Sequence, residues 1–173
     1  MRPVREGVKH TGYSYFISTQ TAGRQPFFRH ERWARLLLST LKHYDETAYC
    51  LHAYVVMPDH LHLLITPFDT AEKAVQLIKG GFSFRARREF NWPGDIWQQG
   101  FTDHRIRDEE DWCNHIEYIR LNPVRARLVV PETTYEFIGF PGKNFPQGLK
   151  PADKDAAHVR TEVRTLRTEE ISH

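Results

Sequence analysis

The sequence predicts an α+β protein of the ferredoxin or RRM-like kind, with a four-stranded antiparallel sheet and helices packed on one face. One reason is the order of the periodic segments, which is strand, helix, strand, strand, helix, strand, helix. The other is a pair of apolar runs in mid-chain that are separated by the turn pair Pro58-Asp59, which predicts a β-hairpin. With 173 residues, 40% apolar and 27% charged, the composition is that of a soluble globular chain with one core.

The individual elements follow from hydrophobic periodicity. Alternating or continuous apolar runs predict strands, and apolar residues at spacings of three and four predict helices. Thr70 and Asp108 are suited to cap the second and third helices, and Asn122-Pro123 is expected to end the third. The expected strands are 13–21, 49–57, 60–66 and a short one within 96–107, and the expected helices are 30–44, 71–90 and 108–121.

Domain organisation and compartment follow from composition. Residues 1–140 are expected to form one domain, and residues 141–173, richer in Pro, Gly and charge, a mobile C-terminal tail. No apolar run approaches the roughly 20 residues that span a bilayer, and the basic N-terminus leads into no signal-peptide core. The two cysteines are far apart and lack a CxxC partner, so a reducing cytoplasm and no membrane association are expected.

Two histidines follow the expected hairpin turn. Because successive side chains of a strand point to opposite faces, His60 and His62 share a face while Leu61 and Leu63 share the other. Two imidazoles at this spacing are able to chelate one divalent cation. The alternative is a pair of histidines on a wet sheet face, but the strongly apolar flanking runs favour the metal site.

The expected helix 108–121 carries two stripes. An apolar stripe of Trp112, Ile116 and Ile119 is expected to face the core. At 100° per residue, a polar stripe with Asp111, His115, Tyr118 and Asn122 lies about a quarter turn away. A helix packed beside the histidine strand would aim Tyr118 at the metal, with Asn122 as an oxygen-donor third ligand. An ordinary half-buried tyrosine on a solvated face is the alternative.

These residues resemble a known family. Residues 55–64, VVMPDHLHLL, closely resemble the HUH motif of single-tyrosine transposases, and 116–129, IEYIRLNPVRARLV, resemble the helix that bears their nucleophile. Together with 97–107, WQQGFTDHRIR, the pattern is most similar to the REP-associated tyrosine transposases, which are IS200-like enzymes. The resemblance is specific over roughly residues 13–131 and fades in the tail.

The resemblance implies a role for each matched residue. His60 and His62 would hold the metal, Mg²⁺ or Mn²⁺, with Asn122 at the place of a further ligand, and Tyr118 would be the nucleophile. The implied reaction is cleavage of single-stranded DNA through a 5′-phosphotyrosine, followed by strand transfer, at DNA hairpins and by a monomer or a homodimer. His115 is either a proton handler or a structural residue of the helix surface.

Basic side chains are the expected contacts to the DNA backbone. Residues 1–43 carry eight lysines and arginines against two glutamates, whereas residues 80–127 carry eight of each sign, so only a spatial sorting of charges would make a basic groove there. The candidates for DNA binding are Arg85, Arg88, His104, Arg105, Arg107, Arg120 and Arg125.

Two other classes fit part of the pattern. A non-catalytic single-stranded nucleic-acid-binding module with an RRM-like fold would share the sheet, but it usually displays aromatic side chains on an open sheet face and has no need of the histidine pair. A different metallohydrolase would use His60 and His62, but the further tandem His or Asp ligands are missing.

Overall fold

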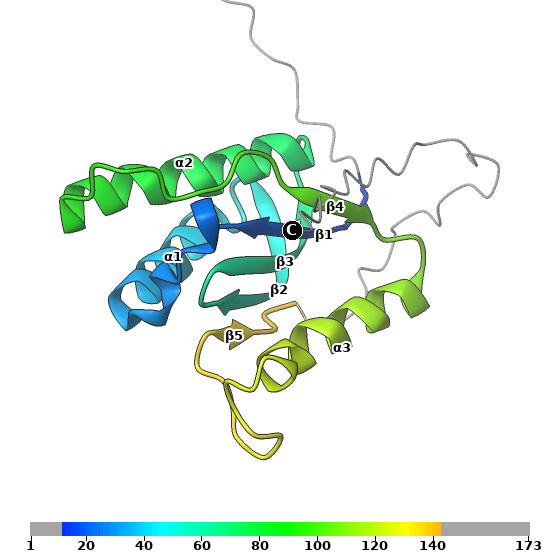
Figure 1. Ribbon diagram of the computed structural model, residues 1–173. Coiled ribbons are helices and arrows are strands. Elements are labelled where there is room, and N and C mark those ends of the chain that lie inside the picture. Colours follow the sequence, from blue (N-terminus) through cyan, green and yellow to red (C-terminus); the bar gives the residue numbers. More distant parts are fainter. Residues whose placement is uncertain (1–11, 143–173) are drawn as a thin grey trace, which may run out of the picture.

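The computed structural model describes residues 12–142, which form an antiparallel five-stranded sheet with the strand order β4-β1-β3-β2-β5 and three helices (Figure 1). The α+β class expected from the sequence is confirmed. The strands are β1 (Tyr15–Gln20), β2 (Tyr49–Met57), β3 (His60–Pro67), β4 (Thr102–Arg105) and β5 (Ile138–Gly139). The helices are α1 (Glu31–Tyr44), α2 (Ala71–Phe90) and α3 (Glu109–Arg125).

The centre of the sheet is the hairpin that the sequence predicted. Strands β2 and β3 pair antiparallel, and Met57 lies opposite His60 across the turn at Pro58 and Asp59. Strand β1 pairs with the other edge of β3 and in turn with β4. The two-residue strand β5, which no pattern in the sequence indicated, extends the sheet beyond β2.

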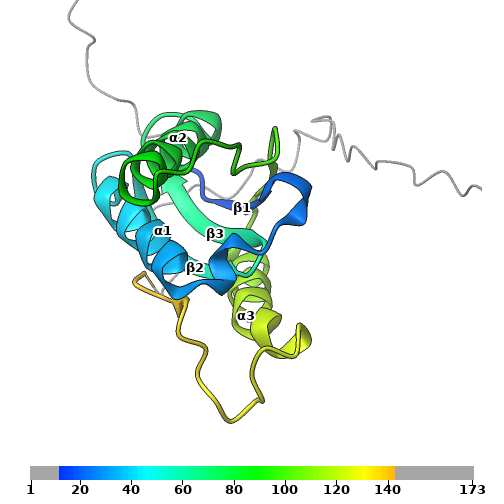
Figure 2. The same cartoon turned by 60° about the vertical axis from the view of Figure 1, so that its left-hand side comes forward.

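The helices cover both faces of the sheet, which corrects the expectation that they pack on one face. Helices α1 and α2 lie together on one side, and α3 lies on the other (Figure 2). Val56 and Leu63 of the hairpin belong to the core beneath α1 and α2, whereas Val55 and Leu64 belong to the core beneath α3. Because both faces of the hairpin are apolar, each face needs a covering layer.

The end of α3 also differs from the expectation. The helix continues through Pro123 to Arg125 instead of stopping at Asn122. A proline removes one backbone donor and disturbs the preceding turn. Here the helix lasts only two residues beyond it, and the amide of Ala126 donates to the carbonyl of Asn122 at 3.0 Å. The cost of the proline is therefore confined to the last turn.

The remaining boundaries agree with the sequence to within a few residues, and the strand expected within 96–107 is β4. Only the first two residues of the expected tail, 141 and 142, are described, and residues 143–173 lie outside the described part of the chain. Among the helices of residues 12–142, none is both long and apolar enough to cross a membrane.

Candidate active site

The histidine pair lies on the face of the sheet that α3 covers. The rings of His60 and His62 stand 4.8 Å apart between centroids, on the same side of β3. Leu61 and Leu63 point to the opposite core, beneath α1 and α2. The alternation of side chains along the strand therefore places the two imidazoles as the sequence predicted.

Each histidine has one ring nitrogen held by a neighbouring side chain. Nδ1 of His60 is 2.6 Å from a carboxylate oxygen of Asp59, and Nδ1 of His62 is hydrogen-bonded to the hydroxyl of Ser18, its partner on β1. Nε2 of His62 is buried and has no hydrogen-bond partner within residues 12–142. Histidine ligands commonly engage their second ring nitrogen in this way, which orients the first towards the metal.

The protonation state of His62 also suits a metal ligand. The side chain is only 6% exposed. Burial, and then the proximity of His60, lower its pKa from 6.5 to about 3. The imidazole is therefore neutral at neutral pH, and the neutral form is the one that binds metal ions.

Helix α3 brings Tyr118 to the histidines. Asp108 caps the helix by accepting the amide of Asp111 at 2.8 Å, and Trp112 and Ile119 are buried against the sheet. The Tyr118 ring meets the His62 ring edge to face, with 5.2 Å between centroids, and remains 38% exposed. The predicted polar stripe therefore lies along the border of the buried face, where a phosphate from solvent has access to the phenol.

Phe16 of β1 is a shared neighbour of these rings. It stacks on His62 at 5.4 Å, and the edge of Tyr118 lies 5.5 Å from it. It also packs against His115 at 4.6 Å. An aromatic wall of this kind restricts the orientation of both His62 and Tyr118.

Asn122 lies one turn after Tyr118 on α3 and is half-buried. Its position on the helix agrees with the predicted stripe. Within residues 12–142 its side chain forms no hydrogen bond with either histidine, so its role as a ligand stays a prediction.

The basic residues expected to bind DNA fall into two groups. Arg85 and Arg88 belong to α2, on the face opposite the histidines, where Arg85 donates to Ser39 and Thr40 of α1. The others lie on or before α3. Arg125 stacks over the Tyr118 ring at 5.9 Å. Three further residues also make contacts within the chain, Arg105 with Tyr13, Arg107 with Asp111, and Arg120 with Glu117.

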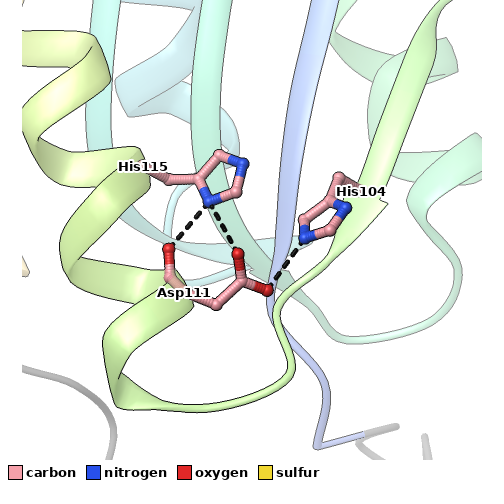
Figure 3. A group of neighbouring side chains, drawn as sticks. All are labelled: His104, Asp111 and His115. Atoms are coloured by element: carbon pink, nitrogen blue, oxygen red, sulfur yellow. Dashed lines mark hydrogen bonds and ion pairs between the residues drawn. The ribbon is translucent and has the colours of Figure 1, made fainter.

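A second cluster lies at the start of α3. His104 of β4 and His115 of α3 both converge on the carboxylate of Asp111 (Figure 3). One donor atom of each residue lies within 4.8 Å of the others, so the group is able to hold a metal ion. The sequence placed His104 among the DNA contacts and Asp111 with His115 on the polar stripe of the helix, and it did not bring His104 to the other two.

Four residues that shape the two clusters were not recognised in these roles from the sequence. Ser18, Asp59 and Phe16 contact the histidine pair, and Asp111 anchors the second cluster. Asp59 was detectable, because it directly precedes His60 in the turn. Ser18 and Phe16 were not, because their contacts depend on the pairing of β1 with β3.

Comparison with known proteins agrees with this geometry. The family model described as "Transposase IS200 like" matches residues 10–121. A REP-associated tyrosine transposase of Escherichia coli K12 is 26% identical, over 82% of this chain and 84% of the relative. A Haemophilus influenzae protein, provisionally described as a REP-associated tyrosine transposase, is 35% identical over 52% of this chain and 56% of its own length.

A solved structure is also similar. It is a REP-associated tyrosine transposase bound to a REP hairpin, with a TM-score of 0.56, 25% identity, and coverage of 75% of this chain and 76% of that one. The fold, the histidine pair and these relatives together define an enzyme of the HUH tyrosine transposase class. The matched region exceeds half of the 173 residues, and the chain belongs to the IS200-like transposase family.

Proposed function

We propose that this chain is a divalent-metal-dependent endonuclease and strand transferase for single-stranded DNA, which cuts at hairpins through a 5′-phosphotyrosine on Tyr118. The observation that carries the proposal is the edge-to-face approach of Tyr118 to His62, at 5.2 Å, beside a histidine pair whose Nδ1 atoms are already engaged. A nucleophile and a metal site are thus built on neighbouring elements of one chain.

The donor set fits a divalent cation. His62 Nε2 is buried without a partner in the described chain, which is costly for a polar atom unless a ligand satisfies it. His60 and His62 would supply two nitrogens and Asn122 an oxygen, a mixed set that suits Mn²⁺ well and Mg²⁺ adequately. When bound, the cation neutralises the phosphate and stabilises the charge that develops in the transition state.

The chain itself supplies the nucleophile and its orientation. The phenolic oxygen of Tyr118 forms a bond to phosphorus while the bond from phosphorus to the 3′ oxygen breaks. The proton lost by the phenol is balanced by the proton that the departing 3′ oxygen gains. Because the phosphodiester is exchanged for a phosphotyrosine of similar energy, attack by a 3′-OH in the reverse sense joins strands.

The proposed substrate is a hairpin or another single-stranded segment, because its phosphate is able to adopt an in-line geometry beside an exposed tyrosine. The similar solved structure was determined with a REP hairpin, which supports this substrate class. Arg120 and Arg125 both follow Tyr118 on α3 and are the candidates for phosphate contacts that lie nearest to it in sequence. Arg85, Arg88, His104, Arg105 and Arg107 are proposed as outer contacts.

The contact between Tyr118 and His62 within one chain supports cleavage in cis, by a monomer. The ring contact belongs to a single copy, and α3 reaches the histidine strand through its own buried face. A homodimer that exchanges α3 would need to break this packing.

The test uses a labelled single-stranded DNA hairpin incubated with Mn²⁺ or Mg²⁺, with and without EDTA, and covalent adducts separated by denaturing gel. Wild type should form an adduct that EDTA prevents. Tyr118→Phe should lower adduct formation on the order of a thousandfold or more, because the attacking oxygen is gone. Tyr44→Phe, at the end of α1 on the other face, is the matched control and should keep it.

His60→Ala separates binding from chemistry. We expect it to bind the hairpin in a mobility-shift assay and to lose cleavage, with unchanged far-UV circular dichroism. An adduct formed by Tyr118→Phe would refute the assignment of Tyr118 as the nucleophile. Hairpin binding by wild type without an adduct at any metal would favour a non-catalytic nucleic-acid-binding module.

A further inference from the structure

The cluster of His104, Asp111 and His115 stands apart from the proposed catalytic pair. The ring of Phe16 packs against both His62 of the pair and His115 of the cluster. The cluster joins two successive elements of the chain, β4 and the first turns of α3. Any ligand held there would cross-link the edge strand to the helix that carries Tyr118.

The carboxylate of Asp111 is the centre of the cluster, and its two oxygens are unequally occupied. Oδ2 accepts His104 Nε2 at 2.8 Å and both the amide and Nε of Arg107 at 3.1 Å. Oδ1 lies 3.3 Å from His115 Nδ1, which is itself hydrogen-bonded at 2.8 Å to the backbone carbonyl of Asp111. Oδ1 therefore keeps acceptor capacity beside two imidazoles.

The carboxylate is held in its charged form. Burial alone would raise the pKa of Asp111, but hydrogen bonds from His104 and Arg107 outweigh burial and lower it below its usual range. The segment from Asp103 to Asp111 also carries five carboxylates against two guanidinium groups. A surface with this balance attracts cations.

We infer that His104, Asp111 and His115 form a second metal site, separate from the catalytic one, that takes a zinc-class cation and fixes α3 against β4. Two imidazoles and one carboxylate, with a fourth position open to water, are a ligand set that Zn²⁺ prefers and Mg²⁺ does not. Each residue would supply one ligand atom, a ring nitrogen from His104 and from His115 and a carboxylate oxygen from Asp111.

To bind the ion through Nδ1, His115 would exchange its 2.8 Å hydrogen bond to the Asp111 backbone carbonyl for a bond to the metal. Donors around a tetrahedral zinc at about 2.0–2.1 Å lie roughly 3.4 Å apart. The His115 to Asp111 separation of 3.3 Å already meets this, and the group as a whole lies within 4.8 Å. The His104 side chain is 41% exposed, so water has access to the open position.

The site has a consequence for the nucleophile. His115 lies one turn before Tyr118, and both pack on Phe16. An ion bound by His115 and by His104 of β4 would hold this turn of the helix against the sheet. Zinc should therefore stabilise the fold as well as bind, because it binds the folded chain in preference to the unfolded one.

The test removes the proposed catalytic pair so that only the second site is read. Metal-free His60→Ala/His62→Ala protein is titrated with Zn²⁺ against a chromophoric chelator, and with Co²⁺ followed by its visible absorption. We expect one equivalent of Zn²⁺, a Co²⁺ spectrum of low coordination number, and a rise in melting temperature with zinc.

Three further changes in the same background identify the ligands. His104→Gln, Asp111→Asn and His115→Gln should each weaken zinc at least tenfold and remove the rise in melting temperature. His43→Gln, an exposed histidine of α1, is the matched control and should change neither. His104→Gln stays informative if Asp111→Asn fails to fold, because His104 is partly exposed.

The inference is overturned if the His60→Ala/His62→Ala protein binds no zinc, or if His104→Gln binds it as tightly as the parent. Neither outcome bears on Tyr118 chemistry, since no DNA is present and the catalytic pair is absent. Failure of the second site is therefore distinguishable from failure of the proposed nuclease.

Discussion

At the scale of the residue, the candidate site depends on neighbours that orient the predicted side chains. His60 and His62 have little rotational freedom, because Asp59 and Ser18 hold their Nδ1 atoms and Phe16 packs on the His62 ring. Oriented ligands bind metal more tightly than mobile ones, because less side-chain entropy is lost on binding.

Ser18→Ala is expected to weaken Mn²⁺ binding by about ten- to a hundredfold, because His62 loses the hydroxyl that orients its ring. The affinity is measured from the electron paramagnetic resonance signal of free Mn²⁺. Ser39→Ala on α1 makes the same chemical change far from the site and should leave the affinity as in wild type. Equal affinities for Ser18→Ala and wild type would show that the hydroxyl does not orient the ligand.

At the scale of the element, α3 matters most, because it carries Tyr118, Asn122 and two residues of the second cluster. Asp108 caps its first turn, and the side chain of Asp111 accepts the amide of Arg107, so the start of the helix is tied to the preceding loop. The equivalent cap of α2 is Thr70, which accepts the amide of Lys73 at 3.2 Å.

Asp108→Ala and Thr70→Ala form a matched pair of cap deletions. Each should lower the free energy of unfolding by about 1 kcal/mol, since one helix amide loses its acceptor. Urea denaturation measures this loss. Only Asp108→Ala should also slow hairpin cleavage, because only α3 carries the nucleophile. Equal cleavage rates in both variants would mean that the start of α3 does not influence Tyr118.

At the scale of the whole molecule, the two cores on opposite faces of the sheet have different roles. The core beneath α1 and α2 contains Leu37, Leu63 and Phe82, and it supports the sheet. The smaller core beneath α3 contains Val55 and Ile119, and it packs the helix that carries Tyr118 against the strand that carries the histidines. The catalytic face is thus built on a scaffold that is stabilised from behind.

Leu37→Ala and Ile119→Ala test this division. Both side chains are fully buried, so each truncation should cost about 2–5 kcal/mol of unfolding free energy. Cleavage is then compared at a temperature where circular dichroism shows both variants folded. Ile119→Ala should be much the slower, because α3 shifts on the sheet. A parallel loss of activity in Leu37→Ala would indicate that stability alone limits the enzyme.

Local features of the chain were readable from the sequence. The alternation around Pro58-Asp59 predicted the hairpin, and with it the shared face of His60 and His62. The caps at Thr70 and Asp108 marked two helix starts. These features depend on periodicity and on hydrogen bonds between residues a few positions apart, which the sequence displays directly.

The tertiary structure alone decided which face α3 covers and what surrounds the histidines. Both faces of β2 and β3 are apolar, so periodicity did not exclude an arrangement with all helices on one face. Ser18 reaches His62 only through the pairing of β1 with β3, and His104 reaches His115 only when β4 and α3 are placed together. Such contacts join residues on different elements, and their geometry is set by packing, which no local pattern encodes.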